Sequence, residues 1–217
     1  MIDAESGEAI ERYILQHSEE ESELLREVAR RTKLEITQAR MMSSHIQGLF
    51  LKFLASAIRP GRMLEIGTLT GYSAIAFASG LPENSILDTI EIDEKSAALA
   101  AEFVRRTPYS DRINIIVGDA KRIIPSLRHT YDLVFIDGKK SEYPWYYDAV
   151  FDRVSLGGYI VADNALWGGR VIGRAADDDQ KTRGVVEFNA RVQRDERVEN
   201  FLLPVRDGFM IIRKRAN

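Results

Sequence analysis

From residue 62 onward, short apolar segments alternate with longer segments whose apolar residues recur at helical spacing. Strands are predicted at about 62–66, 86–92, 112–117, 131–136 and 158–162. Helices are predicted between and after them, at about 71–80, 94–106, 119–128, 141–154 and 181–194. This alternation predicts a parallel sheet with right-handed crossovers and helices on both faces.

Both ends of the chain depart from this alternation. The apolar segments 198–203 and 209–212 flank Asp207-Gly208, a turn signal that predicts an antiparallel hairpin. Residues 1–60 contain no convincing strand, and helical spacing predicts three helices, near 10–14, 22–32 and 43–58, the last ended by Pro60-Gly61. We therefore expect a helical segment preceding an α/β core.

Composition narrows the class of protein. The 217 residues suit a single domain over 1–217, made of the helical preface 1–60 and the core 61–217. The net charge of -3 gives no reason to expect nucleic acid or an anionic membrane, and the chain has no cysteine, which excludes disulfides and thiolate chemistry. No apolar run is long enough for a membrane span, and the acidic N-terminus is unlike a signal peptide, so a cytoplasmic protein is expected.

The first strand ends in a glycine-punctuated turn, Glu65-Ile-Gly-Thr-Leu-Thr-Gly-Tyr-Ser73. Gly67 and Gly71 allow a tight turn close to a ligand, at the strand end where open α/β sheets bind ligands. The spacing lacks the middle glycine of a dinucleotide fingerprint, and the carboxylate of Glu65 would repel a phosphate. The cationic nucleotide S-adenosylmethionine (SAM) fits better, although a turn without ligand function is the competing interpretation.

The next two strand ends are consistent with an adenosine ligand. Glu91 lies about 20 residues beyond the glycine turn, where an acidic residue can accept hydrogen bonds from both ribose hydroxyls of either NAD or SAM. The third strand ends at Gly118-Asp119-Ala120, where a small residue could face an adenine ring. Asp119 is equally well explained as the N-cap of the following helix, and the two roles are compatible.

Polar residues also follow the fourth and fifth strands. Asp137 and the pair Asp163-Asn164 should meet on the same rim as Glu65, because the carboxyl ends of parallel strands share one edge. Two carboxylates and an amide oxygen suit Mg²⁺ or a similar divalent ion rather than zinc. Lys140, three residues after Asp137, could place its amine over the metal, where like charges disfavour the protonated form and favour a general base.

Taken in order, these motifs resemble those of the cation-dependent O-methyltransferases, which include catechol O-methyltransferase and caffeoyl-CoA O-methyltransferase. The motifs are the glycine turn, Ile90-Glu91, Gly118-Asp-Ala120, Ile136-Asp137-x-x-Lys140 and Ala162-Asp163-Asn164 with Trp167. The resemblance runs from about residue 40 to the C-terminus and suggests a bacterial-type member. It implies a Rossmann-like class I SAM-dependent methyltransferase with a mostly parallel seven-stranded sheet and a C-terminal antiparallel hairpin.

The resemblance also implies roles for individual residues. Asp137, Asp163 and Asn164 correspond to the ligands of Mg²⁺ or another divalent cation such as Mn²⁺ or Ca²⁺, and Lys140, with Asp137 beside it, to the catalytic position. Cofactor contacts are implied for Ser43, Glu65, Gly67, Thr68, Ser73, Glu91, Ala120 and Asp137. The implied reaction is methyl transfer to one hydroxyl of a catechol-like small molecule, a vicinal aromatic diol, by a homodimer. Lys139 departs from the acidic residue that plant members carry, which puts any cofactor contact there in doubt.

Three other functions compete with this interpretation. Some bacterial relatives methylate a hydroxylated uridine in tRNA, and basic residues between Arg26 and Arg40 would provide a strip for it. An NAD-dependent oxidoreductase is disfavoured by the glycine spacing, and a non-catalytic domain by the intact set of polar rim residues. Trp167, Trp145 and Tyr143 are candidate walls for an aromatic substrate. The acidic loop 176–180 is interpreted as solvated rather than metal-binding.

Overall fold

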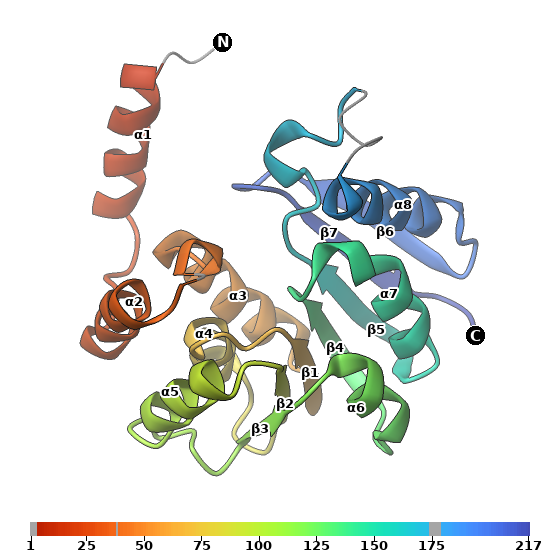
Figure 1. Cartoon of the computed structure of the whole chain (residues 1–217), viewed down its shortest axis with the longest axis horizontal. Helices are drawn as coiled ribbons and strands as arrows, with labels where there is room; N and C mark the ends of the chain where they lie inside the picture. The colour runs from red at the N-terminus through yellow and green to blue at the C-terminus, as the bar shows by residue number, and fades with distance from the viewer. Residues whose placement is uncertain (1–3, 38, 174–178) are drawn as a thin grey trace.

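The computed structural model describes residues 4–37, 39–173 and 179–217. Its seven strands form one sheet in the order β3-β2-β1-β4-β5-β7-β6, drawn in Figure 1. They are β1 Arg62–Ile66, β2 Ile86–Glu91, β3 Ile113–Val117, β4 Tyr131–Ile136, β5 Val154–Ala162, β6 Val198–Leu203 and β7 Phe209–Lys214. The first five strands pair in parallel, whereas β7 runs antiparallel to both β5 and β6, which confirms the predicted hairpin.

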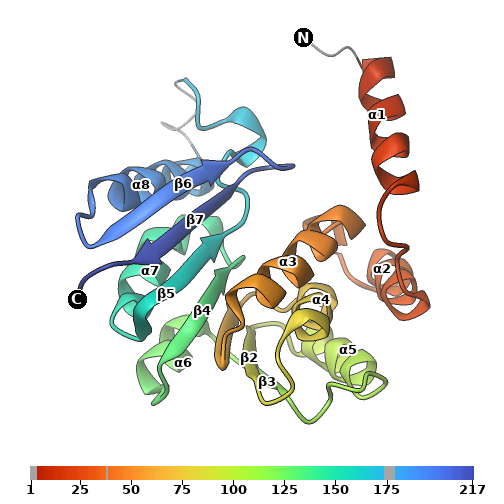
Figure 2. The ribbon, with the colours of Figure 1, turned by 180° about the vertical axis from the view of Figure 1, so that it is seen from behind.

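Helices cover both faces of the sheet (Figures 1 and 2). Because successive strand residues point to opposite faces, Met63 and Leu64 enter different cores. These helices are α3 His45–Ile58, α4 Tyr72–Gly80, α5 Glu94–Val104, α6 Ala120–Ser126, α7 Tyr143–Phe151 and α8 Gln180–Arg194. One core includes side chains of α3, α4 and α5, and the other includes side chains of α6, α7 and α8.

The preface contains α1 Ala4–Gln16 and α2 Glu23–Glu35, followed by the short 3-10 turn η1 Ala39–Met41 and α3. In both views α1 extends away from the rest of the molecule (Figures 1 and 2). It leaves Tyr13 62% exposed and Ile14 41% exposed. No helix of the described ranges is long and apolar enough to cross a membrane.

Two predicted boundaries were wrong. β5 begins at Val154 rather than at about 158, because the pair Gly157-Gly158 interrupts the apolar pattern of a strand that carries a register shift against β4. The helix predicted at 141–154 is a 3-10 turn, η2 Lys140–Glu142, followed by α7 with Pro144 in its first turn. The remaining predicted elements are present, most of them within a few residues of their predicted ends.

The chain order of the strands reverses at β1, which lies between β2 and β4. Helices that leave the carboxyl ends of β1 and β4 pack on opposite faces, so a crevice opens there, and open α/β sheets bind ligands in such crevices.

Candidate active site

The crevice is a cavity of about 500 Å³ at the carboxyl ends of β1, β2, β3 and β4. Its lining includes residues predicted from the sequence to hold a cofactor, among them Gly67, Glu91, Ala120 and Asp137. Lys140 and Trp167 border it as well, the latter from a third 3-10 turn, η3 Trp167–Gly169. The structure therefore brings five of the predicted site residues, Gly67, Glu91, Ala120, Asp137 and Lys140, together around one volume.

The glycine turn brings the end of β1 against the end of β4. Gly67 has φ of +106°, and a Cβ atom there would lie 2.6 Å from the carbonyl oxygen of Asp137. A side chain would force these two strand ends apart. Gly71, with φ of +86°, is the N-cap of α4, and Ser73 lies buried in the first turn of that helix.

Glu65 is fully buried beneath this turn. The Thr89 hydroxyl donates to Glu65 Oε2 at 2.5 Å, whereas Oε1 is buried without a hydrogen-bond partner in the described residues. Burial raises the pKa of Glu65 to about 7. An unsatisfied buried acceptor of this kind fits the ammonium group of a cofactor that supplies the missing donor.

Thr68 is 1% exposed and its hydroxyl lies 2.6 Å from that of Thr89, so it supports the partner of Glu65. Its predicted cofactor contact stays a prediction. Ser43 is also buried, one residue before Ser44, the N-cap of α3.

Glu91 lines the cavity with both of its oxygens already anchored. The backbone N–H of Leu69 donates to Oε2 at 2.6 Å, and that of Asp93 donates to Oε1 at 2.8 Å. Burial raises the pKa of Glu91, and each oxygen keeps a free lone pair for a ribose hydroxyl. Asp119 caps α6 by accepting from the N–H of Lys121 at 2.8 Å, which confirms the predicted N-cap. The next residue, Ala120, lies in the cavity wall.

Lys140 is 1% exposed and its Nζ donates to Asp137 Oδ1 at 2.6 Å and to the Tyr143 hydroxyl at 2.7 Å. The Tyr143 hydroxyl in turn lies 3.1 Å from the carbonyl oxygen of Asp163. Tyr143 is fully buried, so its predicted role as a substrate wall is wrong and it holds the lysine instead. Of the three candidate walls, only Trp167 lines the cavity.

Asp163 and Asn164 follow β5 and meet Asp137 on the rim. Asp163 is 3% exposed, and burial together with the nearby charge of Asp137 raises its pKa to about 7. Burial also raises the pKa of Asp137, against the opposing effect of Lys140. The Asn164 side chain donates through Nδ2 to Asp207 at 3.0 Å, which leaves Oδ1 available as a ligand.

These oxygens fit a hard divalent cation. No group of three or more His, Cys, Asp or Glu side chains within the described ranges could hold a metal, so a site here depends on the amide oxygen of Asn164. The described residues also form no ion pair with Glu65, Glu91 or Asp163, and only Lys140 pairs with Asp137. Three of the four carboxylates on this rim thus lack a cation among the described residues, as expected of a site that binds positively charged groups.

Sequence reasoning missed two side chains that support these ligands. Gln47, in the first turn of α3, donates through Nε2 to Asp163 Oδ2 at 3.1 Å. The Ser44-x-x-Gln47 spacing signals a capping box and therefore a helix start, but not this contact. Asp207 was identified only as part of a hairpin turn.

The Lys139 side chain is 63% exposed, pairs with Glu142 at 3.1 Å and borders the cavity. The Arg40 side chain lies outside the described residues. So do residues 174–178, which include most of the acidic loop 176–180. Asp179 from that loop caps α8.

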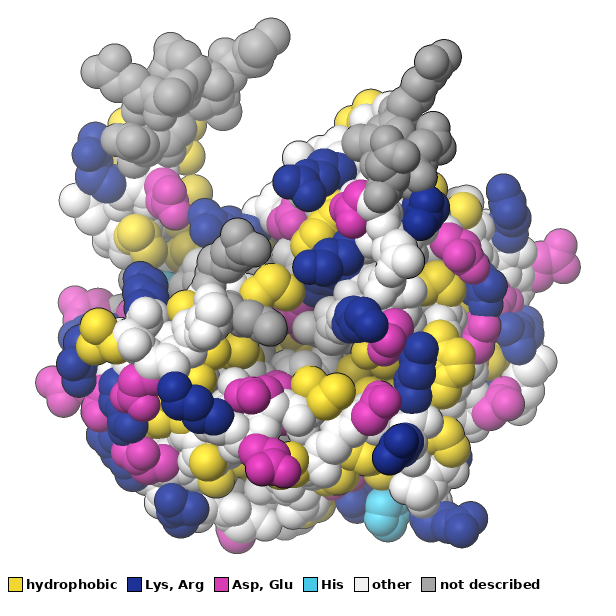
Figure 3. Space-filling view, viewed as in Figure 1, with side chains coloured by type: hydrophobic (Ala, Val, Ile, Leu, Met, Phe, Trp, Pro, Cys, Tyr) yellow, Lys and Arg dark blue, Asp and Glu magenta, His cyan; other side chains and the backbone are white. Residues whose placement is uncertain are grey.

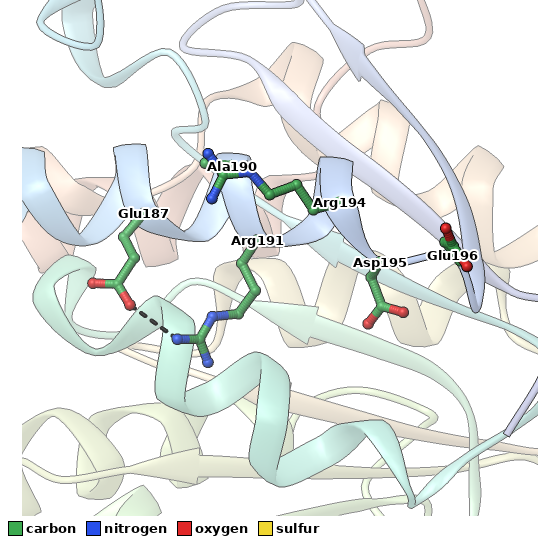
Figure 4. Close-up of a pocket in the computed structure, with 6 residues that line it drawn as sticks. All are labelled: Glu187, Ala190, Arg191, Arg194, Asp195 and Glu196. Carbon is green, nitrogen blue, oxygen red and sulfur yellow. Dashed lines mark hydrogen bonds and ion pairs between the residues drawn. The ribbon is translucent and has the colours of Figure 1, made fainter.

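A separate depression on α8 and the turn after it is lined by charged side chains such as Arg191 and Glu187, which pair with each other (Figure 4). Its lining comes from one helix and its end, so no separate elements converge there.

The sheet order, the crevice at its switch point and the acidic rim together define a Rossmann-like class I SAM-dependent methyltransferase. The O-methyltransferase family model matches residues 15–215, and the chain belongs to that family.

Individual relatives agree with this assignment. The chain is 31% identical to tapetum-specific methyltransferase 1 of Arabidopsis thaliana, over 96% of this chain and 94% of that protein. It is 29% identical to the caffeoyl-CoA O-methyltransferase of Stellaria longipes, over 96% and 91%. The structure superposes on the O-methyltransferase TomG of Streptomyces achromogenes in complex with SAM, with a TM-score of 0.91, 27% identity and full coverage of both chains. The protein is accordingly a SAM-dependent O-methyltransferase.

The rim should make the stability of the ligand-free protein depend on pH. Because folding raises the pKa of Glu65 from 4.5 to about 7, its stabilising contribution is complete below about pH 4.5 and is lost as the pH rises through 7. We expect Glu65→Gln to flatten this dependence by on the order of 3 kcal/mol. Urea unfolding at pH 5 and pH 8, without metal or cofactor, measures the free energy of unfolding of the two proteins. If this free energy falls by the same amount between pH 5 and pH 8 in the wild type and in Glu65→Gln, the raised pKa of Glu65 is contradicted.

Proposed function

We propose that this protein uses a divalent metal, Mg²⁺ or a similar ion such as Mn²⁺ or Ca²⁺, to methylate one hydroxyl of a catechol-like small molecule. The observation that carries the proposal is the buried acidic rim, where Asp137, Asp163 and the Asn164 amide stand beside the cofactor cavity. Charge balance there calls for more cations than a single lysine provides.

The residues around the cavity divide into three groups by what they would hold. Glu65, Gly67 and Ser73 would hold the methionine end of the cofactor, and the resemblance implies a further contact from Ser43 in the preface. Glu91 would receive the ribose hydroxyls, and Ala120 would face the adenine. Asp137 is a proposed metal ligand that also lines this cavity, so the same carboxylate could serve the metal and the cofactor amine.

When bound, SAM supplies the methyl group and the divalent ion stabilises negative charge on the substrate oxygen. The chain itself supplies position and proton transfer. Lys140 Nζ is held at a fixed point by Asp137 and Tyr143, and we propose that it accepts the proton of the reacting hydroxyl. Burial of the rim excludes water, which strengthens each of these electrostatic interactions.

The proposed substrate class rests on the ligand chemistry and on the relatives. Two adjacent hydroxyls can both approach one divalent ion, whereas a single hydroxyl cannot chelate it. A caffeoyl-CoA O-methyltransferase is among the relatives, and Trp167 offers an aromatic surface at the cavity edge. The tRNA alternative gains no support from the comparisons. On the face shown in Figure 3, basic and acidic side chains are interspersed rather than sorted into a basic strip.

Chelation tests the metal directly. We expect excess EDTA to lower the methylation of a catechol at least about 100-fold and added Mg²⁺ to restore it, because the ion would contribute several kcal/mol to catalysis. The panel should contain catechols, matched monophenols and total tRNA, each incubated with SAM and examined by mass spectrometry. Undiminished turnover in EDTA would remove the metal from the mechanism, and methylation of tRNA alone would replace the substrate class.

We also propose a homodimer, formed with the help of α1. This 13-residue helix exposes Ile10, Tyr13, Ile14 and Leu15, and an isolated helix of that length is marginal in water unless its apolar face is covered. Sedimentation should show a dimer for the wild type and a monomer for Ile14→Asp. Leu156→Asp, at a 65% exposed position on β5, is the control that should stay dimeric. A monomeric wild type would contradict this proposal.

A further inference from the structure

We infer that Asp207, in the turn between β6 and β7, is a positioning residue that sets the orientation of the Asn164 amide. The inference rests on the proposed function, because it concerns a proposed metal ligand. Asp207 follows Asn164 by 43 residues, so the contact exists only because the hairpin folds back onto the end of β5.

The contacts of this carboxylate all converge on the segment that follows β5. Asp207 Oδ2 accepts from Asn164 Nδ2 at 3.0 Å, and Oδ1 accepts from the backbone N–H of Gly168 in η3. One side chain therefore connects the proposed metal ligand with the turn that carries Trp167. No other side chain in the described part of the chain is seen to bond the Asn164 amide.

The chemistry of the two groups fixes the direction of the amide. An ionised carboxylate only accepts hydrogen bonds, whereas a primary amide has a donor end and an acceptor end. The NH₂ end of Asn164 must therefore face Asp207, and Oδ1 must face away from it. A neutral amide in place of Asp207 has both a donor and an acceptor, so it could hydrogen-bond either end of the Asn164 amide. Asn164 could then turn its NH₂ group toward a cation and repel it.

The turn that carries Asp207 is fixed by its backbone rather than by this side chain. Leu166 N–H donates to the carbonyl oxygen of Asp207 at 2.8 Å, and Ala165 N–H donates to that of Gly208 at 2.9 Å. A Cβ atom on Gly208 would lie 2.6 Å from Leu166 Cγ, so the two segments are in close contact. Replacing the Asp207 side chain should leave the turn in place and release the amide.

The test measures Mn²⁺ affinity by calorimetry in the presence of S-adenosylhomocysteine (SAH), for the wild type and for Asp207→Asn. We expect the variant to bind Mn²⁺ about 10- to 100-fold more weakly, as is usual when the residue that orients a ligand is lost. Its SAH affinity in EDTA should be unchanged. Asp132→Asn is the matched control. Asp132, like Asp207, accepts from a distant backbone segment, in its case from the N–H groups of Gly61 and Arg62, but it lies near the amino-terminal end of β1.

A double-mutant cycle separates positioning from the loss of a negative charge near the site. If Asp207 acts through Asn164, Asp207→Ala should weaken Mn²⁺ binding in the wild type but not in an Asn164→Ala background. An equal loss in both backgrounds would overturn the inference, as would an unchanged Mn²⁺ affinity of Asp207→Asn or an equal loss in Asp132→Asn. A wild type that binds SAH but no Mn²⁺ would overturn the proposed metal dependence itself, and this inference with it.

Discussion

Replacing Asp163 with alanine is expected to lower methyl transfer about 10³-fold while leaving the metal-free fold nearly as stable as the wild type. The loss of activity follows from removing one of two carboxylates proposed to hold the metal. The small effect on stability follows from the raised pKa of Asp163, because an ionised carboxylate buried beside Asp137 opposes folding. Its two hydrogen bonds, from Gln47 and from the Asn164 backbone, compensate only in part.

Thermal unfolding without metal and steady-state kinetics with Mg²⁺ measure the two effects separately. The melting temperature should change by no more than about 4 °C, the shift expected from about 1 kcal/mol in a chain of this size. Asp88→Ala is the matched control, because Asp88 is also 3% exposed but accepts from Arg62, Asn114 and Tyr131 outside the cavity. It should lose stability and keep its activity. An Asp163→Ala variant that loses stability but keeps its activity, together with an Asp88→Ala variant that loses activity but keeps its stability, would contradict the proposed role of Asp163.

Replacing Lys140 with methionine is expected to lower kcat/KM by about 10² to 10⁴-fold and to remove the acidic limb of the pH-rate profile. A general base works only when deprotonated, so wild-type activity should fall toward low pH. The variant has no such group and should lose that dependence. Lys140→Arg keeps the positive charge but cannot act as a base, so it should be about as inactive as Lys140→Met.

The controls for Lys140 address the stability of the variant. Removing the lysine leaves Asp137 buried without its partner, a change that typically costs about 3 to 5 kcal/mol. Lys214→Met removes another buried lysine, one that donates to the carbonyl oxygens of Phe151 and Val154. It should be destabilised with its pH-rate profile unchanged. An acidic limb that persists in folded Lys140→Met, or an active Lys140→Arg, would contradict the base role.

Local sequence signals determined how much of the fold could be predicted. The strands β1 and β4 were predicted to the residue, because both are apolar runs with a clear polar or glycine boundary. The start of β5 was missed because glycine weakens the strand signal although pairing with β4 continues through it. Gly67, Glu91 and Asp137, which end or follow parallel strands, lie around one cavity as predicted, because the carboxyl ends of parallel strands share one edge of the sheet.

The residues that support the rim could not be predicted, because their contacts join distant segments. Gln47 contacts Asp163 across 116 residues and Asp207 contacts Asn164 across 43. The local patterns around them, a capping box and a hairpin turn, indicate neither contact. Tyr143 was misassigned because an aromatic residue near a loop suits a substrate wall and a buried support equally well. Only its complete burial and its contact with Lys140 distinguish the two roles.

A crystal grown with SAH and Mn²⁺, examined by anomalous diffraction, tests the central claim most directly. The account predicts one strong anomalous peak bonded to oxygens of Asp137, Asp163 and Asn164, with SAH in the adjoining cavity and its ammonium group at Glu65. SAH in the cavity with no Mn²⁺ at these three residues would contradict the proposed metal-dependent reaction.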